Sequence, residues 1–291
     1  TRNINHYKTF VNYLTDKKLN TNILIEGTTS DHKIIDTAMG PEIPLSPNRK
    51  LNLLFALILG VSIPVIIVSL RDFLNDTILS KSDLSKITDI PIIGVIGNSD
   101  NANNLVVLDN PKSVISESFR SLRTNIQYLS SEIENKVVTI TSSVGSEGKT
   151  FCASNLALIM AAAGYKTILI GADLRKPKTH EVFNVDNSKG LSSYLINKST
   201  LSEIIHKTKT EKLRLIPSGP IPPNPSELLN SSRMKELITE LKKTYDYIIL
   251  DTPPCGLVTD SVITMKMSDI NLYIVRHNYT KENMLNIIND L

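Results

Sequence analysis

The apolar positions of this 291-residue chain follow two patterns. Residues 51–70 form one apolar run without a charge, and its length suits an α-helix that crosses about 30 Å of hydrocarbon. From residue 137 onward, short runs of aliphatic and β-branched residues alternate with stretches of helical length. This alternation predicts an α/β fold in which helices cover both faces of a mostly parallel sheet, preceded by a transmembrane helix.

The run at 51–70 has two other interpretations, a buried core helix and a signal peptide. Arg49 and Lys50 before it and Arg71 after it favour a membrane helix, and Pro64 is tolerated in such helices. A signal peptide does not fit, because 50 residues precede the run. Basic residues lie on both sides, so the positive-inside rule gives no orientation.

The same periodicities predict the other elements. We expect strands and helices at these positions: strands at 137–141, 167–170, 213–216, 247–250 and 272–275, and helices at 113–129, 151–163, 201–208 and 226–243. Near the start, apolar residues from Tyr7 to Leu14 recur at helical spacing, and 22–25 suggests a strand. Pro41, Pro44 and Pro47 indicate a stiff, extended connector.

The stretch from Val137 to Phe151 carries the clearest chemistry. A β-branched strand runs into a loop of small residues, which ends at Lys149 and Thr150 where a helix begins. Backbone N–H groups and the helix dipole converge there into an anion site; Lys149 can reach β- and γ-phosphates, and the hydroxyl of Thr150 can ligate Mg²⁺. The predicted nucleotide-binding residues are Gly145, Ser146, Glu147, Gly148, Lys149, Thr150 and Phe151.

This loop departs from G-x-x-x-x-G-K-[ST], because Ser143 occupies the place of the first glycine. The ordinary alternative is a Ser/Gly turn that happens to end in Lys-Thr. The strand before the loop and the helix after it favour a phosphate loop.

Two carboxylates complete the predicted site. Asp251 ends an apolar strand and Asp173 follows another, so both can lie near a Mg²⁺ held by Thr150. We therefore predict Lys149, Asp173 and Asp251 as catalytic, and Thr150 and the two aspartates as metal-binding. Arg175 is a candidate for neutralising phosphate charge or is simply a solvated turn residue.

Together these motifs resemble the bacterial tyrosine kinases of capsule and exopolysaccharide export, in the form fused to a polysaccharide co-polymerase membrane domain. The resemblance extends over almost the whole chain. It includes Asp251-Thr-Pro-Pro254, which resembles the family's Walker B element, and the prolines before the apolar run. The segment Pro217–Leu229 resembles the one that borders the family's nucleotide site. It implies a P-loop NTPase-like fold, ATP and Mg²⁺ as cofactors, and tyrosine autophosphorylation between the subunits of a ring.

Glu117, Arg120 and Arg123 lie three residues apart on the predicted helix 113–129 and are neighbours on its surface. They resemble the E-x-x-R-x-x-R oligomerisation motif of that family. A solvated, salt-bridged helix face is the ordinary alternative.

Three positions depart from the family pattern. Gly171 stands where the family has the first Asp of Asp-x-Asp-x-Arg, so we expect open space there and slow phosphoryl transfer. Gly145-Ser146 replaces Pro-Gly, and the family's tyrosine-rich tail has no counterpart before Leu291. A catalytically weak, nucleotide-binding assembly module is therefore the second hypothesis. A partition-type ATPase is the third, but it would carry a lysine where this chain has Val144, and the membrane helix argues against it.

Charge and cysteine content limit the classes of partner and bond that the chain is expected to form. A net charge of +3 without a dense basic patch argues against nucleic acid. Cys152 and Cys255 lie far apart, which favours free thiols over a disulfide framework. The expected partners are further copies of the chain, tyrosine-containing protein segments, the polysaccharide export and polymerase proteins, and the membrane.

Because ATP is cytosolic, we expect the residues after the membrane helix to lie in the cytoplasm. The predicted organisation is an extracytoplasmic co-polymerase end with its proline-rich connector at 1–48, a transmembrane helix at 49–71, a juxtamembrane linker at 72–110, and a cytoplasmic kinase domain at 111–291 of an inner-membrane protein. Thr1 is not a start methionine, which hints at a longer parent protein.

Overall fold

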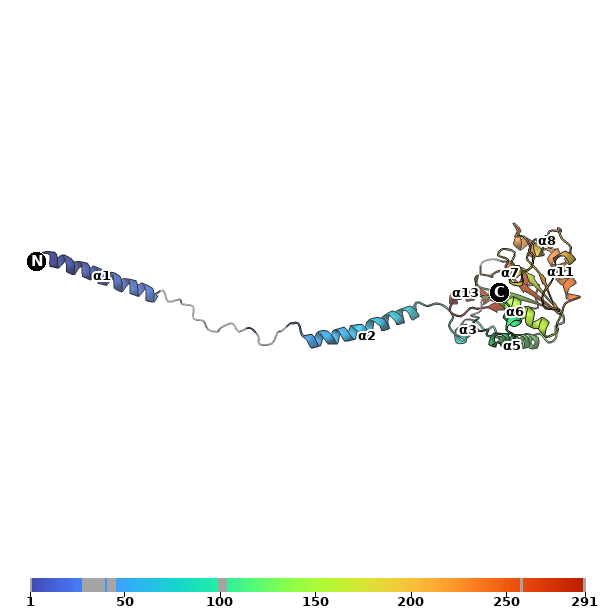
Figure 1. The fold of residues 1–291 in the computed structure, drawn as a ribbon, viewed down its shortest axis with the longest axis horizontal. Helices are drawn as coiled ribbons and strands as arrows, with labels where there is room; N and C mark the ends of the chain where they lie inside the picture. The colour runs from blue at the N-terminus through green and yellow to red at the C-terminus, as the bar shows by residue number, and fades with distance from the viewer. Residues whose placement is uncertain (1, 28–39, 41–45, 99–103, 257–258, 290–291) are drawn as a thin grey trace. The chain divides into compact units, whose positions relative to one another are not determined.

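A computed structural model of the chain describes residues 2–27, 40, 46–98, 104–256 and 259–289 (Figure 1). The chain divides into two compact units, Thr1–Leu70 and Arg71–Leu291. Pro41 and Pro44 of the predicted connector lie outside the described residues.

The described residues of the first unit lie mostly in two long helices. Helix α1 (Arg2–Gly27) includes residues 22–25, so the strand predicted there is wrong. A strand would need a partner for its backbone N–H and C=O groups, whereas the helix satisfies them within the segment. Helix α2 (Arg49–Phe73) contains the predicted apolar run, has no buried residue, and is the one helix of the described residues with the length and composition to cross a membrane.

The second unit is built on a six-stranded sheet with the order β3-β4-β2-β5-β1-β6. The strands are β1 (Lys136–Ser142), β2 (Thr167–Gly171), β3 (His206–Lys207), β4 (Leu213–Ile216), β5 (Tyr247–Asp251) and β6 (Ile270–Ile274). All neighbouring strands are parallel except β3 and β4. The mostly parallel α/β sheet is therefore confirmed.

Helices cover both faces of this sheet, as predicted (Figure 1). The helices are α3 (Lys81–Ile87), α4 (Val106–Asp109), α5 (Val114–Leu129), α6 (Lys149–Ala162), α7 (Thr179–Phe183), α8 (Leu191–Leu195), α9 (Leu201–Ile204), α10 (Pro225–Leu229), α11 (Ser232–Lys242), α12 (Asp260–Met265) and α13 (Glu282–Asn289). Side chains alternate along the strands: Ile249 of β5 packs with α5 and α6, whereas Ile248 packs with α8 and α11.

Two helix predictions needed correction. The helix expected at 201–208 is shorter, because α9 ends at Ile204. Residues 206–207 form β3 instead and pair antiparallel with β4. The helix expected at 226–243 is two helices, α10 and α11. The hydroxyl of Ser231 accepts the Met234 N–H at 3.2 Å and so caps the start of a new helix.

The described residues between α3 and α5, 88–98 and 104–113, fold onto the domain. Ile93, Ile96 and Leu105 pack against the core that α5 and α6 form with the sheet. Asn125 of α5 donates to the Ile93 carbonyl at 2.7 Å, and Asn155 of α6 accepts the Val107 N–H at 3.0 Å. These contacts fix the segment beside the helix that follows the phosphate loop.

Candidate functional site

The phosphate loop lies between β1 and α6 at the carboxyl edge of the sheet. Gly148 immediately precedes α6 with φ of 100°, a left-handed conformation that glycine adopts without a steric penalty, and Ser146 has φ of 65°. The first turn of α6 presents free backbone N–H groups and the positive end of the helix dipole toward this loop. The loop therefore has the local geometry of an anion site.

The Glu147 side chain forms hydrogen bonds that hold the phosphate loop in place. Its buried carboxylate accepts the Val144 N–H at 2.8 Å and a hydrogen bond from the Thr280 hydroxyl. Two further groups hold the loop from outside, because Arg276 donates to the Ser146 carbonyl at 2.7 Å and Tyr279 donates to the Gly145 carbonyl at 3.1 Å. The Glu147 side chain thus stabilises the loop conformation.

Lys149 is folded back over the loop. Its ammonium group donates to the Ser142 hydroxyl at 2.8 Å and to the Val144 carbonyl at 3.2 Å. Burial lowers the pKa of Lys149, while the nearby charges of Asp251, Glu147 and Asp173 act in the opposite direction. A phosphate at the loop would offer this cation a stronger partner than a neutral hydroxyl and carbonyl.

Asp251 lies at the end of β5, beside the first turn of α6. One carboxylate oxygen, Oδ2, accepts the Thr150 hydroxyl at 2.8 Å and the Thr179 hydroxyl at 3.2 Å. Burial raises the pKa of Asp251 to about 6, and the charge of Asp173 contributes, while Thr150 and Lys149 oppose the shift. The residues after Asp251 are anchored to β1, since the Thr252 hydroxyl donates to the Ile140 carbonyl at 2.8 Å and the Thr141 hydroxyl donates to the Pro253 carbonyl at 3.1 Å.

Asp251 and Thr150 have the chemistry of a Mg²⁺ site. The second oxygen of Asp251, Oδ1, is buried and has no hydrogen-bond partner within the described parts of the chain. Mg²⁺ in nucleotide sites takes one or two carboxylates and a hydroxyl, and fills its other positions with water and phosphate oxygens. Accordingly, the described residues contain no cluster of three or more His, Cys, Asp or Glu side chains that would cage a metal.

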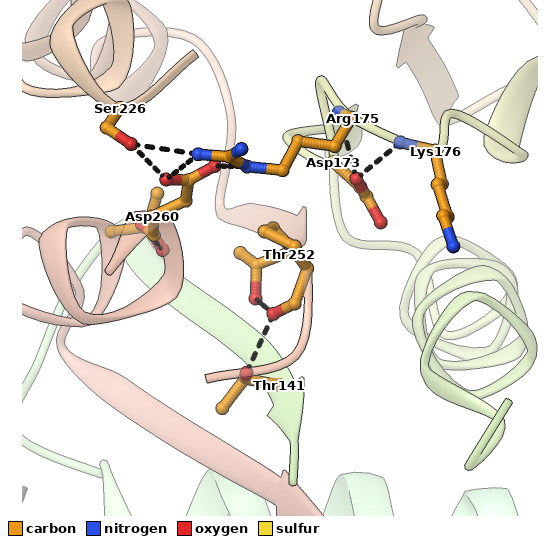
Figure 2. Close-up of polar contacts among 9 residues, drawn as sticks. Thr141, Asp173, Arg175, Lys176, Ser226, Thr252 and Asp260 are labelled. Carbon is orange, nitrogen blue, oxygen red and sulfur yellow. Dashed lines mark hydrogen bonds and ion pairs between the residues drawn. The ribbon is translucent and has the colours of Figure 1, made fainter. Parts of the chain in front are cut away.

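Asp173 and Arg175 occupy the turn after β2. The Asp173 Oδ1 atom accepts the backbone N–H groups of Arg175 at 3.1 Å and Lys176 at 2.9 Å. Arg175 instead extends to Asp260, with Nε at 2.8 Å and Nη2 at 3.1 Å from its carboxylate oxygens, and Nη2 also contacts Ser226 (Figure 2). Arg175 therefore lies at the surface of the turn but is paired, because its guanidinium neutralises the fully buried carboxylate of Asp260.

The open space expected at Gly171 is not there. A Cβ atom at this position would lie 2.6 Å from the Ser218 hydroxyl, 3.0 Å from the Thr179 hydroxyl and 3.1 Å from the Ser218 backbone nitrogen. Gly171 also pairs in register with Asp251 on the neighbouring strand. The volume that a carboxylate would need is already filled by two hydroxyl groups.

The remaining predicted residues lie at the edge of the site or away from it. Phe151 is half-buried and packs against Phe119 of α5, with ring centroids 5.8 Å apart. On α5, Arg120 pairs with Glu117 at 2.7 Å and also donates to the Pro111 carbonyl. Arg123 is half-buried, and its Nε has no hydrogen-bond partner among the described residues.

Sequence reasoning missed Thr179 and Asp260, and it placed Ser218 only within the segment Pro217–Leu229, without giving it a role. Thr179 and Ser218 are short hydroxyl residues in loops or at helix starts, where such residues are common for local reasons. Asp260 is an acidic residue at the start of a helix, which is also ordinary. Their roles follow only from contacts in the folded structure: Thr179 and Ser218 lie against Gly171, Thr179 donates to Asp251, and Asp260 pairs with Arg175.

Comparison with known proteins identifies the family. The profile of the AAA domain family matches residues 135–289. The tyrosine-protein kinase YwqD of Bacillus subtilis is 41% identical over 179 residues, which cover 62% of this chain and 76% of that protein. The chain belongs to the family of bacterial tyrosine-protein kinases. CapB of Staphylococcus aureus is a further relative, 46% identical over 159 residues that cover 55% of this chain and 70% of CapB.

Two solved structures share the fold of the chain. The kinase domain of the Escherichia coli tyrosine kinase ETK aligns with a TM-score of 0.61 at 32% identity, covering 73% of this chain and 81% of that chain. The chimerical protein CapA2B2 aligns with a TM-score of 0.68 at 37% identity, covering 72% of this chain and 92% of that chain. The alignments extend beyond the 135–289 segment, so the chain shares more than its phosphate-loop core with them.

Proposed function

We propose that the chain is an ATP-dependent protein-tyrosine kinase, anchored in the membrane, that regulates the polymerisation and export of capsule or exopolysaccharide. One observation carries the proposal: Lys149, Thr150 and Asp251 meet at one edge of the sheet, with a buried oxygen of Asp251 left without a partner. That edge is a Mg-nucleotide site by its chemistry. Family membership supports tyrosine as the phosphoryl acceptor, because relatives such as YwqD are named tyrosine-protein kinases.

The residues of the site have separate roles in phosphoryl transfer. The loop and the first turn of α6 bind the phosphates, and Lys149 moves from the Val144 carbonyl to the transferring phosphoryl group, where it neutralises developing charge. A bound Mg²⁺ would supply positive charge to the phosphates. Thr150 and Asp251 would hold it, and Asp173 would add negative charge from the neighbouring turn.

A catalytically weak assembly module remains the second proposal, and the surroundings of Gly171 support it. No side chain at 171 offers a carboxylate to the metal or to an incoming tyrosine hydroxyl, which is the role that the family resemblance assigns to this position. General acid–base assistance by a positioned group is worth about 10²–10⁴ in rate, and less in a loose transition state. We therefore expect nucleotide binding to be retained and transfer to be slow.

We propose the cellular arrangement on the same grounds. Residues 49–71 span the inner membrane, 1–48 end an extracytoplasmic co-polymerase segment, 72–110 connect to the domain, and 111–291 are the cytoplasmic kinase domain. Copies assemble into a ring through Glu117, Arg120 and Arg123, of which Glu117 is exposed on α5. The export and polymerase proteins of the polysaccharide are the further partners.

Transfer of labelled phosphate from ATP to a tyrosine-containing copolymer tests the function. The whole chain in detergent should label tyrosine when Mg²⁺ is present, and Lys149→Met should reduce labelling by about 100-fold, the scale for losing one group that stabilises developing charge. Lys166→Met is the matched control, because Lys166 is exposed and precedes β2, at the opposite edge of the sheet. Equal labelling by the parent chain and Lys149→Met would refute the assignment.

A further inference from the structure

Ser218 lies just beyond β4 with its side chain fixed beside the nucleotide site. The residue is 1% exposed, and its carbonyl accepts the Ser192 N–H at 2.9 Å, so α8 holds its backbone. Its hydroxyl lies 2.6 Å from the point where a Cβ atom of residue 171 would stand. Ser218 therefore faces the end of β2.

The Ser218 hydroxyl has no hydrogen-bond partner among the described residues. Burying a hydroxyl without a partner is unfavourable, and native proteins keep such groups rarely and for a reason. A ligand that supplies the missing partner is one such reason.

The neighbours of Ser218 indicate which ligand this is. The Thr179 hydroxyl crowds the same point at 3.0 Å and donates to Oδ2 of Asp251 at 3.2 Å. The other oxygen of Asp251, Oδ1, is also buried and without a partner in the described structure. Ser218 follows β4 and Asp251 ends β5, and these are the two strands that flank β2 in the sheet, so the two unpartnered groups lie on either side of the carboxyl end of β2.

We propose that Ser218 is a further ligand-contacting residue of the nucleotide site, and that its hydroxyl binds an oxygen ligand of the Mg-nucleotide. That oxygen belongs to a metal-bound water or to the terminal phosphate. In this chain the neutral hydroxyl of Ser218, from the loop after β4, fills space at the end of β2 where the family resemblance puts a carboxylate. The inference rests on the proposed nucleotide site and goes beyond it by assigning Ser218.

Ser218→Ala tests the assignment by calorimetry with the Mg²⁺ complex of the non-hydrolysable analogue AMPPNP and the whole chain in detergent. Removing one neutral hydrogen bond should raise Kd about three- to tenfold. The thermal midpoint of the nucleotide-free protein should be unchanged or higher, because a buried hydroxyl without a partner has been removed. Ser154→Ala is the matched control: Ser154 is also buried without a partner within the described structure, but it lies inside α6, and its replacement should leave Kd unchanged.

Repeating the titration with chelator separates the two oxygen sources. A loss that needs Mg²⁺ indicates a metal-bound water, and a loss that persists without Mg²⁺ indicates the phosphate. An unchanged Kd in Ser218→Ala would overturn the inference, and so would a lowered thermal midpoint, because a structural role would then explain the loss. If the parent chain binds no Mg-nucleotide, the proposed function fails together with this inference. If the parent chain binds Mg-nucleotide and Ser218→Ala binds it equally well, only this inference fails.

Discussion

Arg175→Ala should destabilise the folded domain because it leaves the Asp260 carboxylate buried without its cation. Asp260 is fully buried, and Arg175 bonds both of its oxygens. Removing one partner of a buried ion pair costs about 3–5 kcal/mol. The Arg175 side chain is 41% exposed and Ser226 still donates to Asp260, so water and this hydroxyl offset part of the loss, and about 2 kcal/mol is expected.

The acid dependence separates this charge effect from lost packing. Burial raises the pKa of Asp260, but hydrogen bonds from Arg175 and Ser226 outweigh burial and hold the pKa below its ordinary value. Without Arg175 the pKa should rise above that of the unfolded chain. The penalty is then fully present at neutral pH and is relieved as acid protonates the folded carboxylate.

Thermal unfolding of the whole chain in detergent, followed by circular dichroism, measures the effect. At about 2–4 °C per kcal/mol for a domain of this size, the midpoint at neutral pH should fall by about 4–8 °C. Adding Asp260→Asn should recover part of the loss. Lys189→Ala, which breaks the exposed pair with Glu203, should leave the midpoint nearly unchanged. An unchanged midpoint in Arg175→Ala, or an equal loss at neutral and acid pH, would refute the reasoning.

Three further predictions concern the metal site, the membrane and assembly. With chelator present, the raised pKa of Asp251 should lower the free energy of unfolding by roughly 3 kcal/mol as pH rises from about 4 to about 6. Asp251→Asn should abolish this pH dependence in unfolding curves. An unchanged pH dependence in the mutant excludes Asp251 as its source. Ser85→Cys, in a chain without the two native cysteines, should resist impermeant thiol reagents in intact cells, and labelling there would reverse the orientation. Neutralising Arg120 and Arg123 should reduce assembly measured by sedimentation but leave nucleotide affinity nearly unchanged; unaltered sedimentation would indicate an ordinary solvated helix face.

Local sequence patterns predicted much of the fold and the centre of the site. The strand before the phosphate loop, the start of α6 and the apolar strand ending at Asp251 each appear within a few consecutive residues, where periodicity and residue type are informative. In a parallel sheet the carboxyl ends of neighbouring strands meet at one edge. The approach of Thr150 to Asp251 therefore followed once both were placed at strand and helix ends.

The remaining contacts join residues that no local pattern connects. Arg175 and Asp260 are 85 positions apart, and Glu147 and Thr280 are 133 apart. The crowding at Gly171 could not be predicted, because it depends on how the loop after β4 packs beside β2. The break between α10 and α11 depends on the capping serine Ser231. The helical spacing of apolar residues continues across 226–243, so it did not indicate this break.

The acceptor of the phosphoryl group is the most direct test of the central claim. One reaction of the whole chain with Mg-ATP and a tyrosine-containing copolymer should be assayed both for phosphotyrosine and for free phosphate, with Lys149→Met as the blank. The account predicts phosphotyrosine, formed slowly, that depends on both Lys149 and Mg²⁺. Free phosphate released in a Lys149-dependent reaction without any phosphotyrosine would contradict it, because water rather than tyrosine would then be the acceptor.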